Sequence, residues 1–227
     1  MLSVFVKLLP RIPVTLMLTG FSFALGFVFA AGIAFLKLRG NLPLRILAGA
    51  FITIIRCTPP VILFFLVFFG LPVLLSVFGV AVKSTDSNLS AVIAMTLMAS
   101  GIMAEMLRAA FLSVDGGQYE AAVSVGLTPC AALLSVVFPQ AFFIALPNLG
   151  NMIIALLHES SLAYLIGAID VVGRAAILTS NSYGLKAASI YTVVTLIYWG
   201  LTVLLSWIVD VLVLRTGRAN TLVTAGS

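Results

Sequence analysis

The sequence contains very few charged residues. Only 8% of its 227 residues are Asp, Glu, Lys or Arg, whereas a soluble domain usually carries about 25%. Hydrophobic residues make up 62% of the chain, which is more than a soluble fold of this size needs for its core. The composition therefore excludes an ordinary water-soluble domain and favours a protein embedded in a lipid bilayer.

Residues that bind metals or carry out covalent chemistry are also scarce. The single histidine excludes a site built from several histidines, and Cys57 and Cys130 give neither a disulfide framework nor a metal-binding spacing. The phosphate-binding pattern G-x-x-x-x-G-K-[ST] does not occur, so any ATP must be hydrolysed by another polypeptide. We also find no nucleophile paired with a base. We therefore expect no enzyme activity, no metal and no cofactor on this chain.

Long apolar runs are abundant instead. A membrane-spanning helix needs about 20 mainly apolar residues, and several runs reach that length. We predict an all-α polytopic membrane protein that forms a single transmembrane domain over residues 1–227. Residues 166–183 are more polar and predict a short helix at the membrane surface. The five predicted transmembrane helices cover residues 12–36, 45–69, 88–112, 136–164 and 184–213.

The net charge of +5 comes from a few cations near the ends of the apolar runs. This distribution is typical of membrane topology, and we expect no nucleic-acid partner. Residues 37–45 include three cations and no acid, and Arg215 and Arg218 follow the last run. Because cytoplasmic loops are rich in cations, we expect a cytoplasmic C-terminus and an outer N-terminus. Other cations lie on the opposite side, so this bias is weak by itself.

A semi-polar helical segment separates the third and fourth predicted helices. Asp115 can cap a helix that begins at Gly116, and Gln118 can reach back to complete a capping box. Gly126 suits the left-handed residue that often ends a helix. Thr128-Pro129 then supplies a second cap and a favoured first helical residue. The sequence predicts a helix, a sharp turn and a second helix, all facing water.

This segment resembles the EAA loop of the permeases of ABC importers. Members of that family resemble the pattern A-E-x-x-R-x-x-x-x-S-V-x-x-G-Q-x-E-A-A-x-x-x-G. The chain matches it at Ala104, Glu105, Arg108, Ser113, Val114, Gly117, Gln118, Glu120, Ala121, Ala122 and Gly126. The glutamine before the Glu-Ala-Ala run resembles the branch that carries polar amino acids. The alternative is a generic cytoplasmic hairpin.

Two further segments resemble elements of the same branch. Arg56-Cys57-Thr58-Pro59 is similar to R-G-T-P, with cysteine in place of the usual glycine. It could form a helix break along the transport pathway, or Arg56 could instead extend to the nearby membrane interface. Residues 156–162 are similar to L-L-K-x-T/S-S-L, with His158 in place of the usual lysine.

Glu159 lies between apolar neighbours, and an acid inside a membrane span is a functional candidate. A cationic group of the substrate could pair with it. Alternatively, it could be a helix-end residue paired with His158 or Arg174, and His158 itself could be structural. The candidate pathway residues are Arg56, Asn151, His158, Glu159 and Ser160.

The resemblance implies a membrane permease subunit of an ATP-driven importer for polar amino acids in the inner membrane of a bacterium. The loop at about 113–135 would then dock on an ATPase subunit dimer. The remaining partners would be a second permease subunit, identical or homologous, an extracytoplasmic solute-binding protein and the lipid bilayer. The docking residues would be Gln118, Glu120, Ala121, Ala122 and Gly126. The competing hypothesis is a secondary transporter or channel that works alone.

Overall fold

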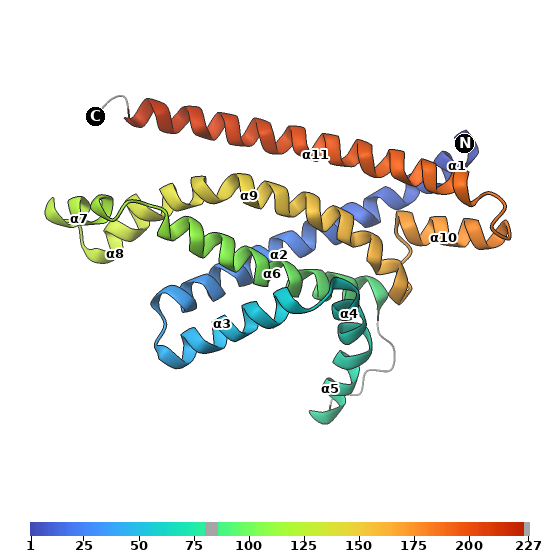
Figure 1. Ribbon diagram of the computed structural model, residues 1–227, viewed down its shortest axis with the longest axis horizontal. Helices are drawn as coiled ribbons and strands as arrows, with labels where there is room; N and C mark the ends of the chain where they lie inside the picture. The colour runs from blue at the N-terminus through green and yellow to red at the C-terminus, as the bar shows by residue number, and fades with distance from the viewer. Residues whose placement is uncertain (80–85, 225–227) are drawn as a thin grey trace.

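The computed structural model describes the backbone of residues 1–79 and 86–224, with side chains up to Leu214. The described chain is mostly helical and contains no strand. Its helices form an elongated bundle with a short helical loop at one end (Figure 1). Five helices are long and apolar enough to cross a membrane. The prediction of an all-α polytopic membrane protein is confirmed.

The first span is longer than predicted. It consists of α1 (Leu2–Leu8), a 3-10 turn η1 (Leu9–Arg11) and α2 (Ile12–Arg39), which together run from Leu2 to Arg39. Pro10 and Pro13 lie in the first turns of η1 and α2, where a missing backbone N–H is tolerated. The helical run therefore continues through both prolines.

The prediction of one helix over residues 45–69 is wrong. The structure has α3 (Leu42–Cys57) and then a second helical run made of α4 (Pro60–Phe65), the π-helical η2 (Leu66–Gly70) and α5 (Leu71–Val77). Thr58 and Pro59 between them are extended, with ψ of 122° and 138°. The two consecutive prolines explain the break, because a residue that precedes proline is sterically excluded from the α region. The second run lies crosswise to the long axis of the bundle (Figure 1).

The third span, α6 (Ser87–Leu112), lies at the centre of the bundle. It packs against α2, α3 and α9 and contributes many of the buried core residues. Asp86 caps it by accepting a hydrogen bond of 3.0 Å from the backbone N–H of Leu89. The Ser87 hydroxyl donates to the carbonyl of Ile166 at 2.8 Å. This bond ties the beginning of α6 to the end of the fourth span.

The fourth span is a long helical run that begins seven residues earlier than predicted. It comprises α8 (Pro129–Ala132), the π-helical η3 (Leu133–Val137), α9 (Phe138–Glu159) and the 3-10 helix η4 (Ser160–Ile166). The predicted short helix over 166–183 is present as α10 (Val171–Asn181), and α11 (Ala187–Thr224) is the last helix. α11 runs back along the bundle toward the end that carries the loop (Figure 1).

Small side chains let α2 and α6 approach closely. Ser22, Gly26, Ala30 and Ala34 are buried at intervals of four residues along α2. A Cβ added at Gly26 would come within 2.6 Å of the Ala99 Cβ on α6, so only glycine fits there. Between membrane helices, small residues permit the close packing that holds the bundle together. A search for glycine pairs alone does not find this stripe, because serine and alanine supply three of its four positions.

Candidate functional site

The predicted loop forms a short helix, α7 (Gly116–Ser124), that projects at one end of the molecule (Figure 1). Asp115 caps it by accepting a hydrogen bond of 2.8 Å from the backbone N–H of Gly117. Gln118 does not complete the predicted capping box, because the described structure contains no hydrogen bond from the Asp115 backbone N–H to the Gln118 side chain. The Gln118 side chain is instead exposed, as is that of Glu120.

The turn after α7 is built from backbone hydrogen bonds. Gly126 has φ of +95°, which favours glycine. Its N–H donates to the Val123 carbonyl at 3.0 Å, and the Leu127 N–H donates to the Ala122 carbonyl at 3.2 Å. This pair of bonds is a Schellman motif. Thr128 then caps α8 by accepting from the Ala131 N–H at 3.3 Å, so the predicted helix, turn and helix are confirmed.

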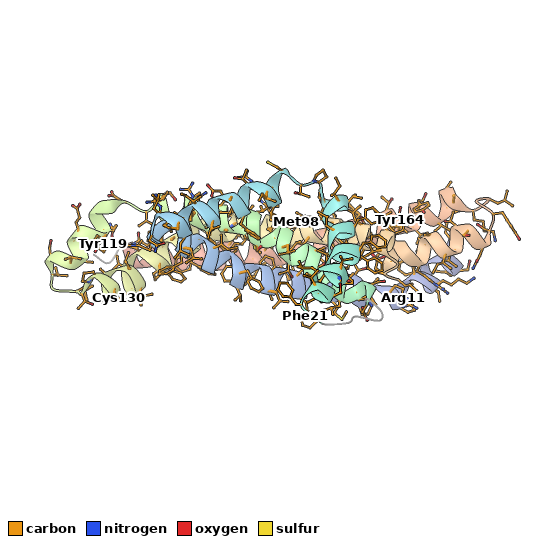
Figure 2. The ribbon with its side chains drawn as sticks, turned by 90° about the horizontal axis from the view of Figure 1, so that it is seen from below. Arg11, Phe21, Met98, Tyr119, Cys130 and Tyr164 are labelled. Carbon is orange, nitrogen blue, oxygen red and sulfur yellow. The ribbon has the colours of Figure 1, made fainter. Side chains whose placement is uncertain are left out.

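The five predicted docking residues do not share one environment. Gln118, Glu120, Ala121 and Gly126 are exposed, whereas Ala122 is 7% exposed and faces the rest of the protein. Figure 2 shows Tyr119 of α7 and Cys130 of α8 at the end of the molecule opposite Arg11. The exposed residues can touch a partner, while Ala122 seats the helix. Their docking role stays a prediction.

An ion cluster links the helices that lead into the loop. Glu105 on α6 accepts hydrogen bonds from Arg108, at 3.0 Å from Nε to Oε1, and from Lys37 on α2, at 3.0 Å from Nζ to Oε2. All three side chains are about a quarter exposed. The spacing of Glu105 and Arg108 predicts their pairing, but Lys37 is a partner that sequence reasoning missed, because it lies 68 positions away. The cluster fixes α2 to α6 four to seven residues before α6 ends.

The helical run that follows the loop contains a π-turn and an adjacent pocket, which permit it to bend. The π-helical turn η3 follows α8 directly, and π-turns inside helices often mark functional sites. A cavity of about 270 Å³ lies between this segment, α2 and α6, lined by Phe35, Phe111, Leu133 and Phe138 among other apolar residues. One side of the loop is therefore fixed by an ion cluster, while the other has a π-turn beside an apolar pocket that opens to the surface.

The candidate pathway residues are spread over two regions. Asn151 and His158 are exposed on α9, and the His158 Nε2 lies 3.0 Å from the Thr202 Oγ1 on α11. Glu159 is partly buried and has no ion-pair or hydrogen-bond partner in the described part of the chain, so the suggested pairing with Arg174 is not formed. Ser160 is buried and its hydroxyl donates to the Leu157 carbonyl at 2.7 Å.

Arg56 is exposed in the last turn of α3. It forms no ion pair or hydrogen bond with the α9 residues in the regions that the structure describes. The helix break predicted beside it is present at Thr58 and Pro59. The structure thus places Arg56 at the break without joining it to Glu159.

A buried acid at the opposite end of the molecule was not among the predicted site residues. Asp170 is fully buried and caps α10 by accepting from the Gly173 N–H at 2.7 Å. The Tyr198 hydroxyl of α11 donates to its other oxygen at 3.3 Å, and the adjacent Val171 N–H donates to Thr15 Oγ1 of α2 at 3.4 Å. These bonds fix α10 against α2 and α11.

Burial raises the pKa of the Asp170 carboxyl, and the hydrogen bonds from Gly173 and Tyr198 oppose that rise only in part. The folded protein therefore holds this proton more tightly than the unfolded chain, and stability falls as pH rises from about 4 through the raised pKa. We expect Asp170→Asn to keep the cap and to flatten this dependence, measured as melting temperature of the solubilised protein between about pH 4 and about pH 7. Asp170→Leu should lose the cap and about 1 kcal/mol. An unchanged pH slope in Asp170→Asn would contradict this role.

Together, the helical bundle and the projecting loop helix define a polytopic membrane transport subunit that can receive a partner at one end. A model of the family described as "Binding-protein-dependent transport system inner membrane component" matches residues 22–218. This chain belongs to that family. It is the multi-pass inner-membrane permease subunit of an ABC importer, and chains of this kind work with an ATPase and a binding protein.

Individual proteins agree with this assignment. The L-cystine transport system permease protein TcyL of Bacillus subtilis (strain 168) is 36% identical over 198 residues, which cover 86% of this chain and 81% of that protein. The probable amino-acid permease protein YxeN of the same organism is 34% identical and covers 92% of this chain and 91% of its own length.

Solved structures show the same fold. A crystal structure of an amino acid ABC transporter with histidines has a chain that superposes with a TM-score of 0.81 at 31% identity, covering 92% of this chain and 94% of that one. An inward-facing structure of the MetNI methionine ABC transporter gives a TM-score of 0.76 at 22% identity, covering 92% of this chain and 96% of its own. The second likeness concerns the fold alone.

Proposed function

We propose that this permease imports a polar amino acid or a close relative. The observation that carries the proposal is α7, a capped helix with a rigid Schellman turn, on a chain that is similar to amino-acid permeases. TcyL is named for L-cystine, and the chain with the TM-score of 0.81 comes from an amino acid transporter. The permease fold supports an importer more than a transporter that works alone.

We propose that the end of the molecule that carries α7 faces the cytoplasm. The turn between α2 and α3 and the C-terminal end of α11 lie toward that same end, whereas α1 and α10 lie at the other (Figure 1). The exposed Arg39 and Arg45 flank the α2–α3 turn, and cations favour cytoplasmic loops. In this orientation the N-terminus is outside and the C-terminus is inside.

The complete transporter, in this proposal, contains two permease subunits, identical or homologous, and two ATPase subunits. ATP is hydrolysed on the ATPases, so this chain needs no cofactor. Exposed Gln118 and Glu120 contact the ATPase, and its closure moves α7 as a rigid unit. The ion cluster joins α2 to α6, so these two helices move as a rigid unit and transmit the motion, while η3 bends. The permease in this proposal has two conformations. ATP binding at one end and substrate binding at the other each shift the equilibrium between these conformations.

Among the candidate pathway residues, Glu159 is the one that we propose contacts a cationic group of the substrate. Its carboxylate forms no salt bridge in the described chain, although the neighbouring His158 interacts with it electrostatically. An acid within a span that lacks a salt bridge favours contact with a substrate cation. We expect Glu159→Gln to change the preference for cationic over neutral amino acids by roughly tenfold, about 1.4 kcal/mol, with little effect on assembly. Competition uptake assays in proteoliposomes measure the preference, and gel filtration measures assembly. Loss of the folded protein instead would make Glu159 structural.

The direct test is reconstitution. We would place the chain in liposomes with the ATPase encoded beside its gene and measure ATP hydrolysis and amino-acid uptake, with and without the neighbouring binding protein. The proposal requires substrate-stimulated hydrolysis and ATP-dependent uptake. Uptake by this chain alone, without nucleotide, would favour the stand-alone transporter.

A further inference from the structure

The turn between α10 and α11 exposes two large hydrophobic side chains. Tyr183 is 94% exposed and Leu185 is 89% exposed, the highest values among large hydrophobic residues in the described chain. The turn lies at the end of the molecule opposite α7 (Figure 1). Exposed hydrophobic residues on a membrane helix are covered by lipid, but a turn outside the hydrocarbon needs another explanation.

The turn is rigid, so the exposure of these side chains is built into its backbone. The Tyr183 N–H donates to the Ser180 carbonyl at 2.9 Å, the Gly184 N–H to Thr179 at 3.0 Å, and the Leu185 N–H to Ser182 at 3.0 Å. Tyr183 has φ of +50°, in the left-handed region, which costs a residue other than glycine about 1 kcal/mol or more. The fold accepts this cost and holds the ring away from its surface.

The base of the turn is also fixed. Asp170 anchors the beginning of α10 to α11 through Tyr198, and the neighbouring Val171 bonds to Thr15 of α2. Leu8, Val171 and Ile190 add a buried apolar cluster between α1, α10 and α11. The turn is therefore presented by a preorganised platform, which reduces the entropy lost when a partner binds.

The part of α11 that precedes Arg215 is longer than the hydrocarbon layer is thick, which places the turn in water. The span Ala187–Leu214 has 28 residues, or about 42 Å of helix, whereas the hydrocarbon layer is about 30 Å thick. If Leu214, just before Arg215, marks one boundary, the other falls near Thr195. Exposed Trp199 and Tyr191 flank that level, where aromatic residues are enriched. The turn then projects about 12 Å beyond the hydrocarbon.

The surface around the turn is positively charged. Lys186 and Lys7 are exposed, and Arg11 and Arg174 are partly exposed. Asp170, the acid within residues 1–11 and 170–186, is buried beneath them. A complementary partner presents carboxylates around an apolar recess that accepts Tyr183 and Leu185. Aromatic side chains in such recesses often contribute most to binding.

We propose that the Tyr183–Leu185 turn is the docking point for the soluble solute-binding protein, which binds it through an apolar recess with an acidic rim. This proposal rests on the proposed function, because it requires an importer whose α10 end faces outward. Anionic lipid head groups could also attract Lys186, but they extend only about 5–8 Å beyond the hydrocarbon, whereas the turn projects about 12 Å beyond it. The protein partner accounts for both the apolar pair and the charge.

The test measures how tightly the binding protein engages the whole transporter. The permease and its ATPase are placed in nanodiscs, and the binding protein encoded beside them, loaded with its amino acid, is titrated while ATP hydrolysis is followed. Tyr183→Asn with Leu185→Ser removes the apolar pair and keeps a residue that tolerates positive φ. We expect the half-saturating concentration to rise at least about tenfold, with unchanged hydrolysis in the absence of binding protein.

Three further variants sharpen this test. Tyr183→Phe keeps the ring and should stay within about twofold of the wild type. Lys186→Glu reverses the local charge and should also raise the half-saturating concentration, more at low salt than at high salt. Leu2→Ser is the matched control, because Leu2 is 79% exposed at the same end of the molecule but lies on a helix; it should have no effect.

An unchanged half-saturating concentration in both the double variant and Lys186→Glu overturns the proposal. It is also overturned if the double variant changes only the dependence of hydrolysis on anionic lipid, which would make the turn a membrane anchor. If the wild-type complex is not stimulated by binding protein at all, the proposed function itself fails. Failure of the docking proposal alone gives a different result: the binding protein stimulates the wild-type complex, and the variants respond as the wild type does.

Discussion

Replacing Gly126 with proline is expected to lower ATP-driven uptake by roughly a hundredfold while the chain stays in the membrane. Gly126 has φ of +95°, and its N–H donates to the Val123 carbonyl. Proline fixes φ near −65° and removes the N–H, at a cost of about 3 kcal/mol. The Schellman turn would open, and α7 would no longer be held against α8. Uptake and ATP hydrolysis in proteoliposomes measure the loss of coupling.

Gly116→Pro is the matched control for this variant. Gly116 is the first residue of the same helix, where proline is favoured, and Asp115 before it already has the extended ψ of 127° that precedes proline. A Cβ added at Gly116 or at Gly126 meets no atom within 4 Å, so steric crowding does not separate the two. Equal uptake in the Gly126→Pro and Gly116→Pro proteins would show that the turn does not transmit motion.

Glu105→Gln is expected to destabilise the permease by about 1–3 kcal/mol, because it leaves partly buried Lys37 and Arg108 beside each other without a carboxylate. The fixed link between α2 and α6 would weaken just before the loop. We expect a lower melting temperature of the solubilised protein and, in proteoliposomes, more ATP hydrolysed for each amino acid imported. Thermal unfolding and the ratio of hydrolysis to uptake measure the two effects.

Glu120→Gln provides the control for stability, since Glu120 is exposed and has no ion pair in the described structure. This variant should leave the melting temperature unchanged. Lys37→Met removes one cation while the pair of Glu105 and Arg108 remains, so it should cost less than Glu105→Gln. The cluster would have no structural role if the melting temperatures of Glu105→Gln and the wild type were the same.

The loop shows where local sequence is sufficient. Asp115, Gly126 and the Thr128-Pro129 pair each act on backbone groups a few residues away, so their pattern predicted helix, turn and helix correctly. The predicted capping box forms only in part. Asp115 caps the helix, but the Gln118 side chain extends into solvent and does not reach back to Asp115. A side chain at the surface has several conformations of similar energy, and sequence alone does not select among them.

The second predicted helix shows the opposite case. Residues 45–69 read as one apolar run, but Pro59 and Pro60 divide it, and α4 turns across the bundle. The resemblance to R-G-T-P indicated a break, yet its direction depends on packing against α6 and η4. Local sterics specified where the helix ends, and long-range contacts specified where the chain goes next.

The sequence by itself determined that the chain is helical, membrane-embedded and equipped with a capped loop helix, because hydrophobicity, proline and capping residues act over short distances along the chain. Only the tertiary structure decided that Lys37 joins Glu105 and that Asp170 is buried where α10 packs against α2 and α11. These features depend on residues that are far apart in sequence and become neighbours only when the helices pack, so their energies are not encoded in any single segment.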